Sequence, residues 1–351
     1  MSVRRNPPPA PLLRGGPRTA PAPTVTGRRR APLTELASRL TARDTWLLEM
    51  LAEHTVLTTT HITALWHTSQ RSANRRLLQL HRLGLLDSFR PRLQRGAAAE
   101  HYLLARTGAD LLAARYATTP AALGWSPDLI TRTAYSPVLT HDLGVATFFT
   151  QLATPAAPAL GRADAWWSEA RCRRTWGDLV RPDAYGHHTP HPVLEPGDDG
   201  DGLGFFLEYD TGTESHTRLA AKLDEYAEGA AATRIRPLVL FTVHSHRREQ
   251  HLHKALATHP ALDAINVATT ARDIHATGST AHHPAEAVWL PLARPTHRLN
   301  LLHLPTAWPP DARPTRDLQA DTDPTPRHTS LPAADPRCPD TPPAHRAGPE
   351  E

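Results

Sequence analysis

The chain has 351 residues, of which 40% are hydrophobic and 21% charged, and its formal net charge is +4 at pH 7. This length allows two modest folded domains with flanking tails, and the basic balance favours a polyanionic partner. No apolar run approaches the ~18 residues of a membrane-spanning helix. The two cysteines, Cys172 and Cys338, are too few and too far apart for a disulfide framework or a zinc ribbon. We therefore expect a cytoplasmic protein with no membrane partner.

Composition divides the chain into five segments. Residues 1–33 are rich in Pro and Arg and contain no acidic residue, and residues 305–351 are rich in Pro, Asp and Thr. Neither end shows periodicity, so both are predicted to be disordered tails. Residues 34–118 and 138–304 are the two predicted folded domains, and residues 119–137 are the linker between them. The predicted fold class is therefore α+β with more than one domain.

The segment 34–118 combines helical periodicity with a short hairpin. Apolar residues at helical spacing predict three helices, and Gly84 is placed to cap the end of the third. Thr41 and Asp44 offer capping chemistry at the start of the first. The predicted elements are helices at 41–55, 57–66 and 70–83, strands at 85–91 and 100–105, and a closing helix at 107–116. Three helices and a two-stranded wing are the plan of a winged helix-turn-helix.

The third predicted helix carries a basic face opposite its apolar stripe. A helix fits the major groove of DNA, where Arg pairs with guanine edges and Asn with adenine edges. Arginines on the wing would meet phosphates, which fix the register without reading the sequence. The residues predicted to bind double-stranded DNA are Arg71, Asn74, Arg75 and Arg82 on the helix and Arg90, Arg92 and Arg95 on the wing. The alternatives are a solvated helix face or a protein-binding domain; a homodimer would suit two-fold DNA sites.

The segment 138–304 is predicted to fold as a sheet covered by helices, which is an α/β domain. The order is a helix, three strands, a helix, a short apolar strand suited to the middle of a sheet, and then a further helix and strand. A polar insert at 187–202 separates the second strand from the third. The predicted helices are 141–153, 215–231 and 246–257, and the predicted strands are 164–174, 178–186, 204–209, 236–243 and 264–270.

Two carboxylates lie at the end of the third of these strands, in the stretch GFFLEYDTGTE. Side chains alternate between the faces of a strand, so Glu208 and Asp210 should point to the same face as Phe206. Like charges held this close repel, and desolvation strengthens the repulsion. A hard divalent cation takes several oxygen ligands and would neutralise such a pair. The simpler alternative is a turn in which Asp210 caps the following helix.

The strand order, with Pro182-Asp183 on one strand and Glu208 on the next, resembles the PD-(D/E)xK nuclease superfamily. The resemblance implies a restriction-endonuclease-like domain that binds Mg²⁺ or Mn²⁺ and cleaves phosphodiesters by water attack. The superfamily expects a lysine where Asp210 stands, and Lys222 on the next helix is the candidate replacement. The implied catalytic residues are Asp183, Glu208, Asp210 and Lys222, and the implied metal ligands are Asp183, Glu208 and Asp210. Glu169 is a further candidate ligand.

A second resemblance is carried by stretches in both predicted domains. They are LTARDTWLLEMLAEHTVLTTTHI, RRLLQLHRLGLL, HYLLARTGADLLA, RPDAY, FFLEYDTGTE and KLDEY. These stretches resemble the replication-relaxation family of actinobacterial plasmid and mobile-element proteins. The resemblance implies a role with plasmid or element DNA in replication, copy control or transfer. It does not decide whether the acids are catalytic.

Two other interpretations stay open at this point. A relaxase of the His-hydrophobic-His class would use His244 and His246 on a metal and Tyr226 or Tyr135 as nucleophile, although Ser245 replaces the apolar residue. A transcription or replication regulator would use the winged helix alone, with a catalytically inactive nuclease-like domain. The histidines His187, His188 and His191 are close enough for a metal site, but chance clustering is favoured in a chain with 22 histidines.

Overall fold

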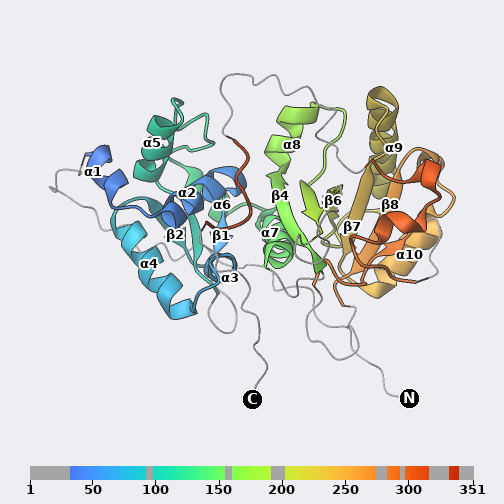
Figure 1. Ribbon diagram of the computed structural model, residues 1–351, viewed down its shortest axis with the longest axis horizontal. Coiled ribbons are helices and arrows are strands. Elements are labelled where there is room, and N and C mark those ends of the chain that lie inside the picture. Colours follow the sequence, from blue (N-terminus) through green and yellow to red (C-terminus); the bar gives the residue numbers. More distant parts are fainter. Residues whose placement is uncertain are drawn as a thin grey trace, which may run out of the picture. The chain divides into compact units, whose positions relative to one another are not determined.

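The computed structural model describes residues 32–91, 98–154, 160–190, 202–273, 283–292, 297–315 and 332–339. The chain divides into two compact units, Met1–Leu143 and Gly144–Glu351, which are called unit 1 and unit 2 below. Both units mix helices with a sheet, and Figure 1 labels most of their elements. No helix in the described ranges is long and apolar enough to cross a membrane.

Unit 1 consists of helices and a small antiparallel sheet with the strand order β1-β3-β2. In chain order its elements are α1 (Leu33–Ser38), α2 (Ala42–His54), β1 (Leu57–Thr58), α3 (Thr59–Leu65), α4 (Gln70–Arg82), β2 (Leu86–Phe89), β3 (His101–Leu104), α5 (Arg106–Arg115), α6 (Leu129–Ala134) and the start of α7 (Leu139–Ala153). The predicted helices are confirmed as α2, α3, α4 and α5, and the predicted hairpin strands as β2 and β3.

Helix α2 begins where predicted because Thr41 and Asp44 form a capping box. The Thr41 hydroxyl accepts the Asp44 amide (3.2 Å), and the Asp44 carboxylate accepts the Thr41 amide (2.8 Å). Asp44 also accepts a hydrogen bond from Nε of Arg76 on α4 (2.9 Å). Burial alone would raise the pKa of Asp44, but the bonds from Arg76 and Thr41 lower it overall. This partly buried ion pair links α4 to α2.

The segment 119–137 is not a linker but part of unit 1. Its helix α6 contributes Leu129 to a buried cluster with Val56, Phe89, Leu103 and Leu139. Three prolines in this segment are typical of a linker and obscured apolar anchors such as Leu129. The division between the units falls later than predicted, between Leu143 and Gly144 inside α7.

Unit 2 is built on a six-stranded sheet with the order β4-β5-β6-β7-β8-β9. Strands β4, β5 and β6 are antiparallel, β6, β7 and β8 are parallel, and β9 is antiparallel to β8. Its further elements are β4 (Arg162–Ser168), α8 (Glu169–Trp176), β5 (Ala184–Thr189), β6 (Leu203–Tyr209), α9 (His216–Thr233), β7 (Leu238–Val243), α10 (His246–Leu256), β8 (Asn266–Ala271) and β9 (Leu290–Pro291).

Alternation along β6 distributes its side chains between two cores. Phe206 packs with Leu223 and Tyr226 of α9 on one face. Phe205 points to the opposite face, where its ring stacks on Phe149 of α7 with centroids 6.1 Å apart. Strand β7 is buried along its whole length, as expected for the middle of a sheet.

Two predicted strands of unit 2 begin or end differently from the prediction. Residues 164–174 were predicted as one strand, but β4 stops at Ser168, whose hydroxyl caps α8 by accepting the Arg171 amide (3.3 Å). The predicted strand 178–186 begins only at Ala184, because Pro182 has no amide to donate to a ladder. Asp183 therefore precedes β5 instead of ending a strand.

Part of the predicted disordered tail has defined structure. Residues 304–315 contain two short 3₁₀ helices, Leu304–Ala307 and Pro310–Ala312, and Trp308 is buried. Thr315 exchanges two hydrogen bonds with Arg236. Residues 332–339 are also described, and Pro332 accepts a bond from Arg171. These contacts join residues far apart in the sequence and do not involve regular helices. They therefore leave no periodic pattern in the tail from which they could be predicted. The prediction for the leader, residues 1–33, falls almost entirely outside the described residues.

Candidate functional site

Helix α4 presents two adjacent stripes beside its buried one. Ala73, Leu77 and Leu80 face the core of unit 1, and the Ser69 hydroxyl caps the helix by accepting the Ser72 amide. Residues three or four positions apart lie on the same side of a helix. One stripe carries the exposed Arg71, Arg75 and Arg82, which we call the arginine stripe. The other carries Gln70, Asn74, Leu78 and His81, which we call the amide stripe.

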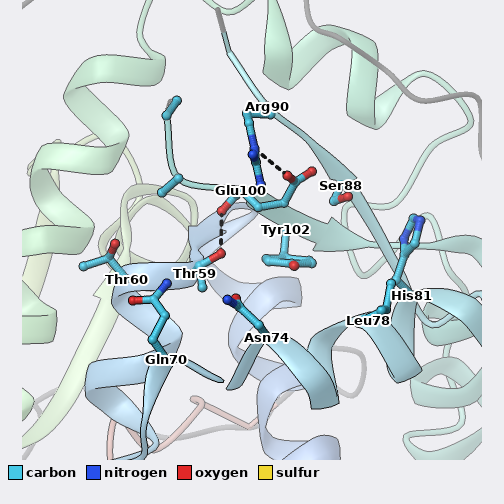
Figure 2. A pocket seen from close by; sticks show the side chains of 12 residues that line it. Thr59, Thr60, Gln70, Asn74, Leu78, His81, Ser88, Arg90, Glu100 and Tyr102 are labelled. Atoms are coloured by element: carbon cyan, nitrogen blue, oxygen red, sulfur yellow. Dashed lines mark hydrogen bonds and ion pairs between the residues drawn. The ribbon is translucent and has the colours of Figure 1, made fainter. Parts of the chain in front are cut away.

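The amide stripe faces a hollow of about 630 Å³ that is open to solvent, and Figure 2 shows its side chains. The opposite wall comes from the β2–β3 pair, which contributes Ser88, Arg90, Glu100 and Tyr102, and the start of α3 contributes Thr59 and Thr60. Leu78 is 46% exposed at this surface, which is unusual for a leucine in a helix that has its own buried stripe. The hollow is thus a mainly polar recess between a helix and a hairpin, with Leu78, Ala98 and Ala99 as apolar contacts.

The predicted DNA-binding residues separate into three groups. Asn74 and Arg90 line the hollow. Arg71, Arg75 and Arg82 lie on the neighbouring stripe, and none of them has an ion-pair partner within the described ranges. Arg92 and Arg95 lie outside the described residues. Gln70 and His81 also line the hollow and were missed from sequence, although their spacing to Asn74 and Leu78 carried the signal.

In unit 2, the structure brings Glu208 of β6 and Lys222 of α9 together. The Lys222 ammonium donates to one Glu208 oxygen (2.6 Å), and the Tyr226 hydroxyl donates to the other (2.6 Å). The Glu208 side chain is 2% exposed. Lys222 also pairs with Glu214 at 3.3 Å. The sequence did not decide whether the Lys222 side chain faces the core or the solvent. In the structure it points inward, toward Glu208.

Asp183 lies next to this pair. Its carboxylate accepts the amide of Tyr209 (2.6 Å), and its own amide donates to the carbonyl of Leu207 (3.1 Å), which fixes it at the end of β6. Burial, followed by the charge of Asp183, raises the pKa of Glu208 to about 8, and Lys222 and Tyr226 only partly oppose this. Burial would lower the pKa of Lys222, but the charges of Glu208 and Asp183 raise it overall. The bonds from Lys222 and Tyr226 therefore offset only part of the cost of burying Glu208 beside Asp183.

Asp210 has different partners. It lies on the same face as Glu208, as the alternation predicted, but both of its oxygens accept from the Arg248 guanidinium of α10. One oxygen also accepts the amide of Gly212 (2.8 Å), which closes a turn. The following helix is capped by Ser215 instead. Glu208 and Asp210 are thus each paired with a basic side chain from a helix, Lys222 of α9 and Arg248 of α10 respectively.

The carboxylates of Asp183 and Glu208 are suitable ligands for a divalent cation, but they are few. Carboxylate oxygens are the ligands that Mg²⁺ and Mn²⁺ prefer, and each oxygen keeps a second lone pair beside its hydrogen bond. Within the described residues, however, no group of three or more His, Cys, Asp or Glu side chains is placed to hold a metal ion. Two carboxylates would leave most coordination positions to water or substrate oxygens, as is common for Mg²⁺.

Several of the other candidates have local partners, and the rest are exposed or lie outside the described residues. Tyr226 is 2% exposed and bound to Glu208, whereas Tyr135 is 62% exposed. His187 pairs with Asp164 (2.8 Å), and His188 is fully buried with Nε2 at 2.6 Å from the carbonyl of Leu160. His246 starts α10, where its amide donates to Asp273. Glu169 is exposed at the start of α8, and His191 lies outside the described residues.

Comparison with known proteins gives one match. A family model described as replication-relaxation matches residues 48–238, which is more than half of the chain and includes parts of both units. No curated protein and no solved structure matches the chain significantly.

Proposed function

Because the chain belongs to the replication-relaxation family, we propose that it binds double-stranded DNA of a plasmid or mobile element. In this proposal unit 1 is a winged helix-turn-helix with α4 as recognition helix and the β2–β3 pair as wing. The observation that carries it is the arginine stripe on α4, exposed and without an ion-pair partner in the described residues. An unpaired basic stripe beside an open polar hollow suits a polyanion better than it suits an apolar partner.

The two stripes of α4 have different roles in this proposal. Arg71, Arg75 and Arg82 contact phosphates or guanine edges, while Asn74 and Gln70 are amides of the kind that pair with adenine edges. Leu78 offers an apolar contact for a thymine methyl group. A helix that enters the major groove presents both stripes at once, one to the backbone and one to the bases.

The experiment is a salt titration of binding between the purified full-length protein and a fluorescent duplex. Counterion release predicts that log Kd rises linearly with log salt concentration, with a slope of about 0.9 for each phosphate contacted. Binding to duplex with such a slope supports the proposal. An absence of duplex binding at low salt would refute it.

A second candidate function is metal-dependent cleavage of that DNA in unit 2. It is favoured by the convergence of Asp183, Glu208 and Lys222, the acids and the lysine that the nuclease resemblance implied. Asp183 and Glu208 would hold the ion, which would supply charge neutralisation at the phosphodiester. Lys222 stays protonated, so it would orient a water or phosphate oxygen by donating hydrogen bonds. Asp210, committed to Arg248, fits a supporting role better than a ligand role.

We expect supercoiled DNA to be nicked in the presence of Mg²⁺ or Mn²⁺ and not in the presence of EDTA. Glu208→Gln keeps the shape of the side chain but removes its charge, so nicking should fall at least roughly 100-fold. Glu225→Gln, at an exposed position of α9, is the control with the same change in net charge. Nicking that persists in Glu208→Gln would exclude this site, and intact binding without nicking would leave the protein a DNA-binding regulator.

A further inference from the structure

One acidic side chain lies in the hollow that the proposed DNA interface includes. Arg90 directly follows β2 and Glu100 directly precedes β3, so the two face each other across the hairpin next to the Phe89–His101 pair. The Arg90 guanidinium donates from Nε to the Glu100 carboxylate at 2.9 Å. Among the described residues that line the hollow, Glu100 is the only acid (Figure 2).

The Arg90–Glu100 pair is partly exposed to solvent, so another anion can replace Glu100 on Arg90. Arg90 is 52% exposed and Glu100 is 23% exposed. Exposed ion pairs of this kind contribute little to the stability of a fold, so folding does not require this one. Glu100 is held in place by its backbone instead, because its carbonyl accepts the amide (2.8 Å) and the hydroxyl (3.3 Å) of Thr59. The carboxylate can therefore be changed without disturbing the contact between the hairpin and α3.

We infer that Glu100 is a specificity-determining residue that weakens binding to DNA in general; this inference rests on the proposed function. In the free protein this carboxylate is paired with Arg90, which lines the hollow. A phosphate that binds Arg90 must displace that carboxylate and then lies close to it, and like charges at such distances repel. This penalty is the same for every sequence. Only DNA that also satisfies Asn74 and Gln70 on the amide stripe gains enough from base contacts to offset it.

The test compares Glu100→Gln with wild-type protein on duplexes of unrelated sequence. Removal of the carboxylate frees Arg90 for one more phosphate, so affinity should rise roughly 3- to 10-fold and the salt slope should steepen by about 0.9. Asp110→Asn is the matched control: it also frees an arginine, Arg106, and changes the net charge equally, but both residues lie outside the hollow. In an Arg90→Gln background, Glu100→Gln should have no more effect than Asp110→Asn.

The outcomes separate the inference from the proposed function. If wild-type protein does not bind duplex at all, the proposed function fails and the inference fails with it. If wild-type protein binds but Glu100→Gln matches Asp110→Asn in affinity and salt slope, only the inference is overturned. Weaker binding by Glu100→Gln to particular sequences would also overturn it, because the carboxylate would then be accepting from a base such as cytosine.

Discussion

Replacing Arg248 with methionine should lower the free energy of unfolding of unit 2 by about 3–5 kcal/mol. The Asp210 side chain is 1% exposed and the Arg248 side chain 13%. Arg248 contacts both Asp210 oxygens and also donates to the carbonyl of Glu214 (2.6 Å). Methionine fills a similar volume but leaves Asp210 as a buried charge without its cation. Removing one partner of a buried ion pair is far more destabilising than replacing both partners with apolar residues.

Denaturation in urea, followed by tryptophan fluorescence, measures this effect, because Trp166 and Trp289 are buried in unit 2. Arg247→Met, one position earlier on the exposed side of α10, is the control and should change stability by less than about 0.5 kcal/mol. Adding Asp210→Asn to Arg248→Met should restore part of the loss, since the buried charge is then gone. If the two methionine variants unfold alike, the Asp210–Arg248 pair does not stabilise unit 2.

Replacing Arg71, Arg75 and Arg82 together with alanine should weaken binding to duplex DNA roughly 100-fold at about 0.15 M salt. Each lost phosphate contact also removes about 0.9 from the salt slope, so the slope should fall by up to about 2.7. The three side chains are exposed and, within the described residues, form no ion pairs, so their removal should leave the fold intact. The loss of affinity is then a direct measure of their contacts with DNA.

The control for this prediction removes three exposed arginines from unit 2, Arg173, Arg181 and Arg247, which gives the same change in net charge. Its effect should be limited to long-range attraction, which salt screens over about 10 Å at 0.1 M. Equal losses in the two triple variants would contradict the assignment of the interface to α4. Arg76 is unsuitable for either set, because its loss would leave Asp44 buried and unpaired.

The elements of unit 1 could be predicted because their signals are local. Ala73, Leu77 and Leu80 define α4 by spacing alone, and Thr41 with Asp44 defines the start of α2. The end of β4 was missed because a strand that runs into a capped helix has no break in its apolar pattern until the cap residue, Ser168. Alternation along the strand was sufficient to place Glu208 and Asp210 on one face.

The partners of the charged residues could not be predicted in the same way. Arg76 is 32 positions from Asp44, and Arg248 is 38 positions from Asp210. Such pairs depend on how helices pack against each other, which the periodicity of each helix does not specify. Lys222 shows the same limit: the sequence left its face open, although it lies one turn from Tyr226 on α9 and both side chains reach Glu208. The catalytic role of Lys222 stays a prediction, as do the catalytic and metal-binding roles of Asp183, Glu208 and Asp210.

The most direct test of the DNA interface is the protection of single cysteines from a maleimide by bound duplex. Leu78→Cys on α4 and Leu179→Cys in unit 2 replace leucines that are both 46% exposed, and the native Cys172 and Cys338 are buried. We expect duplex DNA to slow labelling at position 78 at least roughly 10-fold and to leave position 179 unchanged. Protection at position 179 with unchanged labelling at position 78 would contradict an interface on α4.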